Sequence, residues 1–206
     1  MNSLGGLILA AGCSTRMGQS KPLLDWYGQT LIEYQIKIFN YLSIEPIVIL
    51  GFQSEMIQKK IKNLNAKIVV NQNYSQGKSS SVLLGINSLK SNSDLLLLSV
   101  DQPRPKKMIE KIIKSHNESN AILTVPKYNQ NGKLRGGHPI IIGNKIINNL
   151  SEFINRGKTV KDFVVSQTAV NQLIFDDILI RLDLNDKDDY HEAIRLFENY
   201  GNNEYR

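Results

Sequence analysis

Short apolar runs alternate along this chain with segments whose apolar residues recur at helical spacing. Residues 95–100 form a strongly apolar run, typical of a central parallel strand covered on both faces. Strands are predicted at residues 6–10, 46–50, 67–70, 95–100, 121–125, 139–142, 172–175 and 178–182. Helices are predicted at residues 30–42, 55–63 with Ser54 as N-cap, 80–88, 106–115, 144–155, 159–166 and 188–199. This alternation favours an α/β fold with a mostly parallel, doubly wound sheet.

Size and composition favour a single domain spanning residues 1–206. Hydrophobic residues make up 41% of the chain, which argues against disorder. The single cysteine, Cys13, rules out an internal disulfide and a multi-cysteine zinc site. No apolar run reaches the ~18 residues of a membrane span, and no basic segment of a secretory signal precedes the first strand. We therefore expect a cytoplasmic protein that does not enter a membrane.

The net charge of +6 raises the question of a nucleic-acid partner. The lysines are scattered, and no basic run is interleaved with aromatic residues. An anionic small substrate explains the same excess of positive charge, so no nucleic-acid partner is expected.

A loop rich in small residues follows the first predicted strand. It contains Gly12 and Gly18, and it carries two cations, Arg16 and Lys21. Small residues let backbone N–H groups approach a ligand closely, and the cations add the charge that a polyphosphate needs. The glycine spacing matches neither Gly-x-Gly-x-x-Gly nor the P-loop pattern. A phosphate-binding loop at the end of the first strand is the simplest interpretation.

A second candidate site lies at Asp101, directly after the most apolar strand. Ligands of open α/β sheets bind beyond the carboxyl ends of the strands. A carboxylate there that faces a phosphate loop suits Mg²⁺, which binds through one or two carboxylates plus substrate phosphates. A turn or N-cap aspartate before Pro103 is the alternative, and the local sequence does not choose between the two.

Other residues that often carry chemistry have simpler interpretations here. His116 and His191 lie in predicted helices, where we expect them to be exposed, and neither has a partner at zinc-binding spacing. Trp26 and Tyr27 are expected to be packing residues. Cys13 is expected to be a passive loop residue.

Five segments together resemble one family. Residues 9–24 read Leu-Ala-Ala-Gly-x-Ser-x-Arg-Met-Gly-x-x-Lys-x-Leu-Leu and resemble the signature of nucleotidyltransferases. The Gly-Lys-Ser-Ser-Ser turn in residues 71–81 is similar to the Gly-x-Ser-Ser-Ser segment of molybdenum cofactor cytidylyltransferases. Residues 100–103 and 137–139 are similar to that family's metal-binding strand end and Gly-His-Pro motif, and residues 183–190 resemble its C-terminal motif. The resemblance implies a three-layer α/β/α, Rossmann-like nucleotidyltransferase fold.

The resemblance also implies a role for each matched residue. Arg16 and Lys21 are the implied catalytic residues, Arg16 on the β- and γ-phosphates and Lys21 over the α-phosphate. Asp101, with Asn185 or Asp183, is implied to hold Mg²⁺. The implied nucleotide-binding residues are Leu9, Ala10, Ala11, Gly12, Ser14, Thr15, Lys21, Ser79, Ser80 and Ser81, and the implied acceptor-binding residues are Gly137, His138 and Pro139. The chain departs from the pattern at Asn185, which stands where the family has a second aspartate, and at Gly136, which separates Arg135 from Gly-His-Pro.

The function implied by the resemblance is transfer of CMP from CTP to a molybdopterin-type cofactor, with Mg²⁺ as cofactor and release of pyrophosphate. CTP is favoured because Leu-Ala-Ala-Gly and the serine segment resemble the cytidylyl branch, whereas the guanylyl branch tends to read Leu-Ala-Gly-Gly. Two alternatives stay open. One is transfer to a sugar or polyol phosphate. The other is a non-catalytic maturation protein that binds molybdenum cofactor for a molybdoenzyme such as xanthine dehydrogenase.

Overall fold

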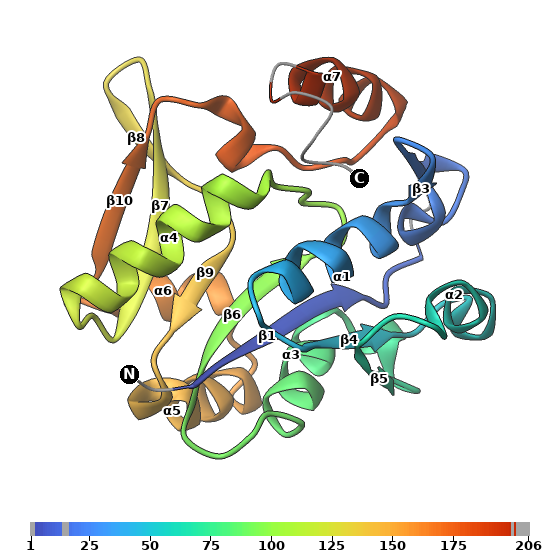
Figure 1. Cartoon of the computed structure of the whole chain (residues 1–206). Helices are drawn as coiled ribbons and strands as arrows, with labels where there is room; N and C mark the ends of the chain where they lie inside the picture. The colour runs from blue at the N-terminus through green and yellow to red at the C-terminus, as the bar shows by residue number, and fades with distance from the viewer. Residues whose placement is uncertain (1–2, 14–16, 199, 201–206) are drawn as a thin grey trace.

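The computed structural model describes residues 3–13, 17–198 and 200. Its main sheet contains eight strands in the order β10-β7-β9-β6-β1-β4-β5, with β8 paired to β7 outside this path (Figure 1). The strands are β1 (Ser3–Ala10), β4 (Pro46–Leu50), β5 (Lys67–Val70), β6 (Ser93–Ser99), β7 (Leu123–Gln130), β8 (Lys133–Gly136), β9 (Ile140–Ile142) and β10 (Asn171–Phe175). Only β9 and β8 run against the other strands of this sheet. The predicted mostly parallel sheet is therefore confirmed.

Helices cover both faces of the sheet and give the molecule three layers (Figure 1). Side chains alternate along β1, so that Ile8 packs into one hydrophobic core while Leu7 and Leu9 pack into the other. The core on the Ile8 side includes residues of α1 (Leu31–Tyr41), α2 (Ser54–Ile61), α4 (Lys106–Ser119) and α7 (Lys187–Glu198). The other core includes residues of α3 (Lys78–Ile86), α5 (Asn144–Asn155) and α6 (Val160–Ser166). The three-layer α/β/α arrangement is confirmed.

Four details differ from the sequence prediction. Residues 178–182 are not a strand, because Ile178–Arg181 form the 3-10 helix η4, whose first turn is capped by the Asp177 side chain. Ser54 is the first residue of α2 rather than its N-cap, a position taken by Gln53 in a left-handed conformation. Two hairpins were not predicted, β7–β8 and the pair β2 (Asp25–Trp26) and β3 (Gln29–Thr30).

The C-terminal helix packs on the hairpin that follows the first loop. Tyr27 donates a hydrogen bond to the carbonyl of Ile194 (2.6 Å), and Tyr190 donates one to the carbonyl of Asp25 (2.7 Å). Trp26 is fully buried between these elements and contacts Phe197 edge-on, which confirms its expected packing role. The end of the chain therefore fixes the segment next to the candidate phosphate loop.

The expectation for His116 was wrong, whereas His191 is exposed as expected. His116 is only 5% exposed because α4 turns it towards the sheet, where its ring bonds the Thr124 hydroxyl at 2.8 Å. Every helix among the described residues is too short or too polar to cross a bilayer.

Candidate active site

The loops that carry the candidate residues meet at the carboxyl ends of β1 and β6. These two strands pair in parallel, and the N–H of Val100 donates to the carbonyl of Leu9 at 2.9 Å beyond the last pair. That bond places Asp101 beside the start of the glycine-containing loop. The loops that follow β4 and β5 begin at the same edge of the sheet.

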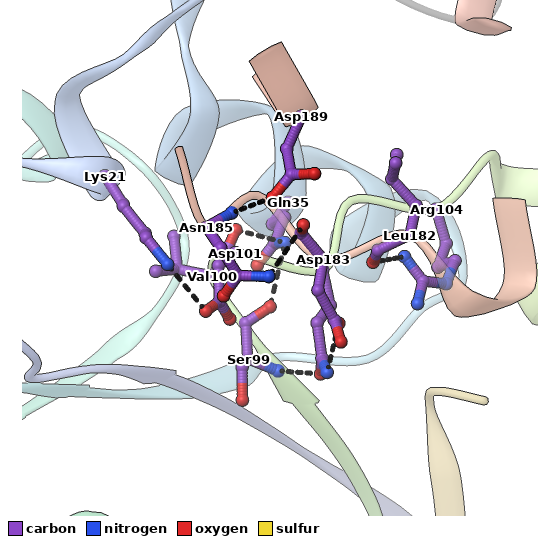
Figure 2. Close-up of polar contacts among 11 residues, drawn as sticks. Lys21, Gln35, Ser99, Val100, Asp101, Arg104, Leu182, Asp183, Asn185 and Asp189 are labelled. Carbon is purple, nitrogen blue, oxygen red and sulfur yellow. Dashed lines mark hydrogen bonds and ion pairs between the residues drawn. The ribbon is translucent and has the colours of Figure 1, made fainter. Parts of the chain in front are cut away.

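Lys21 and Asp101, 80 positions apart in the chain, meet at this edge. The Lys21 ammonium lies 3.0 Å from Oδ2 of Asp101, and both side chains are partly buried (12% and 29% exposed) (Figure 2). Lys21 begins the 3-10 helix η2 (Lys21–Leu23), in which Pro22 fixes the first turn. The other carboxylate oxygen of Asp101 accepts no hydrogen bond from the described residues. Lys21, from the loop after β1, and Asp101, at the end of β6, therefore meet as the sequence predicts.

A cavity of ≈ 260 Å³ opens over this pair. We call it the first cavity, and its lining is Leu9, Ala11, Gly12, Lys21, Tyr74, Gly77, Lys78, Ser81, Ser99, Val100 and Asp101. Of the predicted nucleotide-binding residues, Ala10 and Ser80 do not line it, and Ser79 lines a second cavity beside it. Ser14, Thr15 and Arg16 lie outside the described residues.

The serine segment is held in place by Asn71 at the end of β5. The Asn71 side-chain amide donates to the hydroxyls of both Ser80 and Ser81 at 2.9 Å. Gly77 precedes α3 with a φ of 101°, a conformation that side chains other than glycine rarely adopt. The turn therefore presents Ser81 to the first cavity, while the Ser80 hydroxyl is occupied by its contacts with Asn71 and Gly77.

A C-terminal segment joins the site from the other side. The N–H of Leu184 donates to the carbonyl of Asp101 at 2.8 Å, which brings Asp183 and Asn185 next to the β6 end (Figure 2). Asp183 accepts a hydrogen bond from the Gln102 amide at 2.7 Å, and the Asn185 amide donates to the Asp183 carbonyl at 3.2 Å. The described residues contain no group of three or more His, Cys, Asp or Glu side chains placed to hold a metal. A cation here would need ligands beyond these carboxylates.

Arg104 anchors this segment, and the sequence analysis missed it. It is 1% exposed, and its guanidinium donates to four carbonyls, those of Pro103, His138, Ile180 and Leu182, at 2.7–2.9 Å. Burial lowers the pKa of Arg104 to about 10, and the charges of Asp183 and Asp101 oppose that shift. The side chain remains charged at neutral pH and joins the β6 end, the loop before β9 and the segment after β10.

Gln35 of α1 was also missed, because a lone buried amide belongs to no sequence motif. Its side chain is 2% exposed and donates to the carbonyls of Ser99 (3.2 Å) and Val100 (3.0 Å) (Figure 2). It thereby fixes the strand end that carries Asp101. The only advance signal was a polar residue on the apolar face of a predicted helix.

A second cavity of ≈ 540 Å³ adjoins the first and shares Lys78 and Ser99 with it. Gly137 and His138 line it, whereas Pro139 does not. A side chain at Gly137 would collide with the Ile180 carbonyl, so only glycine allows this close approach to η4. Burial, followed by the charges of Lys78 and Arg104, lowers the pKa of His138 to about 3. The imidazole is therefore neutral at physiological pH.

The family model of the MobA-like NTP transferase domain matches residues 6–170, about four fifths of the chain. The chain belongs to this family. It is 29% identical over 143 residues to the molybdenum cofactor cytidylyltransferase of Escherichia coli K12, covering 69% of this chain and 71% of that protein. It is 32% identical over 136 residues to a protein of Thermococcus sibiricus named "Probable molybdenum cofactor guanylyltransferase", covering 65% and 66%. It is also 28% identical over 141 residues to the nicotine blue oxidoreductase of Paenarthrobacter nicotinovorans, covering 66% and 69%.

Solved structures share the fold. The crystal structure of Rv0371c from Mycobacterium tuberculosis H37Rv superposes with a TM-score of 0.79 at 22% identity, over 95% of this chain and all of that chain. A second structure of Rv0371c, in complex with manganese, gives a TM-score of 0.75 at 20% identity, over 94% and 98%. The MobA-like chain described here is therefore a nucleotidyltransferase of the predicted fold and is related to enzymes of molybdenum cofactor biosynthesis.

Proposed function

We propose that this MobA-like protein transfers CMP from CTP to a phosphorylated, molybdopterin-type acceptor and releases pyrophosphate. The observation that carries the proposal is the Lys21–Asp101 pair at 3.0 Å in the first cavity, which shares Lys78 and Ser99 with the second cavity. The first cavity contains the glycine-containing loop and suits a triphosphate. The second cavity suits the acceptor, because it opens beside the same strand end.

Lys21 is the proposed catalytic residue. Transfer of a nucleotidyl group needs positioning and charge stabilisation more than covalent help from the protein. A Lys21 ammonium over the α-phosphate stabilises the negative charge that grows there as the acceptor phosphate attacks in line. The acceptor phosphate is already ionised at neutral pH, so the reaction requires no protein base. In the absence of substrate, Asp101 holds the Lys21 ammonium in the first cavity.

The residues present fit a divalent cation that shares its ligands with substrate phosphates. Asp101 has one carboxylate oxygen without a hydrogen bond from the described residues, and the Asp183 and Asn185 side chains lie on the adjoining segment. Mg²⁺ binds through one or two carboxylates and leaves its other positions to phosphates and water. Asp101, with Asp183 or Asn185, would hold the Mg²⁺, whose charge neutralises the phosphates. The manganese complex of Rv0371c, which has the same fold, supports a divalent cation.

CTP is the proposed donor because Leu9, Ala10, Ala11 and Gly12 retain the pattern that resembles the cytidylyl branch. The exposed free thiol of Cys13 is compatible with a reducing compartment, which supports action in the cytoplasm.

The decisive experiment measures pyrophosphate release by the purified protein with molybdopterin, Mg²⁺ and each of CTP, GTP, ATP and UTP. We expect release with CTP to exceed release with the other nucleotides, and we expect a sugar phosphate to replace molybdopterin poorly. In the same assay Lys21→Ala should lower the rate of release by about a hundredfold or more. Lys62→Ala is its matched control, because Lys62 is exposed at the end of α2 and lines neither cavity. Cofactor binding without pyrophosphate release from any nucleotide would contradict the proposal and favour a carrier.

A further inference from the structure

The charged side chains that line the second cavity are all positive. Five cations line it, Lys78, Lys127, Arg135, Lys161 and Arg181, and none of the described residues that line it is acidic. None of the five forms an ion pair with a described residue. Like charges gathered around one space repel one another, and an anion that enters it relieves the repulsion. The cavity is therefore suited to an anionic ligand.

The five cations are divided between the two ends of the cavity. Lys78 begins α3 and also lines the first cavity, so it lies at the junction where the transfer is proposed to occur. Lys127 and Arg135 come from the paired strands β7 and β8, and two strands, β9 and β6, lie between β7 and β1 in the sheet. Arg181 of η4 donates to the Gln130 side chain at 3.3 Å, which holds it against the same hairpin. Four of the cations are thus on elements that do not contribute to the first cavity.

The wall between these two ends is apolar. It is formed by side chains of the sheet and of two helices, Leu97, Val125, Ile140, Val82, Val160 and Val164. Val165 of α6 also lines the cavity and is 76% exposed. An apolar wall with a few charged groups at its ends is the usual form of a site that orients an elongated organic ligand.

We infer that the second cavity binds an acceptor with two anionic groups separated by an apolar or aromatic body. One group is the phosphate that attacks at the junction beside Lys78, and the second is held by Lys161, Arg181 and the cations of the β7–β8 hairpin. This inference rests on the proposed function for the direction of the ligand. The requirement for a second anion rests on the charges of the cavity alone.

Three matched compounds test the second anion directly. They are 2-naphthyl phosphate, 6-carboxy-2-naphthyl phosphate and 6-carbamoyl-2-naphthyl phosphate, of which the last two differ only in charge at the remote end. Binding to the whole protein without nucleotide is measured by isothermal titration calorimetry at low salt. We expect the carboxylate to bind about tenfold more tightly than the carboxamide, because hydrogen bonds to charged groups are stronger than neutral ones. An advantage below about threefold overturns the inference.

Two variants assign the effect to the remote cations. Lys161→Gln and Arg181→Gln should each reduce the advantage of the carboxylate at least threefold while changing the affinity for the carboxamide less than about twofold. Lys62→Gln removes the same charge from a residue outside both cavities and should change neither value. An advantage that survives in both cavity variants overturns the assignment to this end.

The pyrophosphate assay run in parallel separates the two proposals. Discrimination between the compounds without pyrophosphate release from any nucleotide contradicts the transferase proposal and leaves the two-anion cavity supported. Pyrophosphate release without discrimination between the compounds supports the transferase proposal and overturns the two-anion cavity.

Discussion

Replacing Arg104 with methionine tests how the two cavities are held together. The guanidinium lies between the turn after β6, the loop before β9 and the segment around η4, and its hydrogen bonds join all three (Figure 2). Methionine keeps an unbranched apolar stem in this buried position and removes all five N–H donors. The effect therefore reports the hydrogen bonds more than the packing.

The magnitude follows from which carbonyls lose their donor. The Ile180 carbonyl still accepts from the N–H of His138 at 3.1 Å, whereas no other donor among the described residues reaches the carbonyls of Pro103, His138 and Leu182. A buried polar group left unpaired costs about 1–3 kcal/mol. Relief from burying the charge, which lowers the pKa of Arg104 to about 10, offsets part of this cost. We expect a loss of about 3 kcal/mol, or about 6–12 °C in melting temperature for a chain of this size.

Urea unfolding followed by the fluorescence of Trp26, the only tryptophan and fully buried, measures this loss. Arg104→Lys keeps a charge but not the planar fork, so it should recover less than half of the stability. Arg156→Met is the matched control, because Arg156 is exposed and pairs with Glu152 at 3.6 Å on the surface of α5, where about 0.5 kcal/mol is expected. A loss below about 1 kcal/mol for Arg104→Met would refute the anchoring role.

Three further outcomes test the site. Lys21→Ala should lower the rate of pyrophosphate release by about a hundredfold or more while nucleotide affinity changes only a few-fold, and a rate within about threefold of wild type contradicts its role. Asp101→Asn should raise the Mg²⁺ concentration for half-maximal rate by about tenfold, and an unchanged titration curve moves the metal elsewhere. His138, whose pKa is lowered to about 3 from 6.5, should show no imidazole titration by NMR between about pH 5 and 8. The pKa of His138 is lower in the folded than in the unfolded state, so its contribution to stability is present above pH 6.5 and is lost as the pH falls towards 3. His138→Asn should therefore reduce the loss of stability on the acid side.

Seven strands of the main sheet, all except β8, were predictable because their signals are local. The apolar run that became β6 and the helical period of Asn144–Asn155 depend on residues that are neighbours in the chain. The same holds for the nearness of Asp101 to the loop after β1, since parallel strands bring their carboxyl ends to one edge. The 3.0 Å contact with Lys21 also depends on the path of that loop to η2, which strand topology does not fix.

The residues that position the site were not predictable in this way. Arg104 and Gln35 act on backbone carbonyls, which every residue has, so no partner motif marks them in the sequence. His116 was expected to be exposed because helical periodicity alone does not say which polar side chain has a partner inside the fold. The segment at residues 178–182 has an apolar pattern, but the Asp177 cap and the Arg104 contacts make it η4 rather than a strand.

One departure from the family pattern, Asn185, falls in the segment of residues 180–185, which connects the two cavities. Arg181 lines the second cavity, the carbonyls of Ile180 and Leu182 bind Arg104, and the N–H of Leu184 binds the Asp101 carbonyl. A shift of this short segment therefore moves Arg181, a cation of the second cavity, and the backbone of the proposed metal ligand Asp101 together. Asn185, which stands where the family has aspartate, leaves the proposed metal site with one negative charge fewer. It does not alter the backbone hydrogen bonds of the segment. We therefore predict that catalysis in this chain depends more on Asp101 and on the anchoring of the segment than on the side chain at position 185.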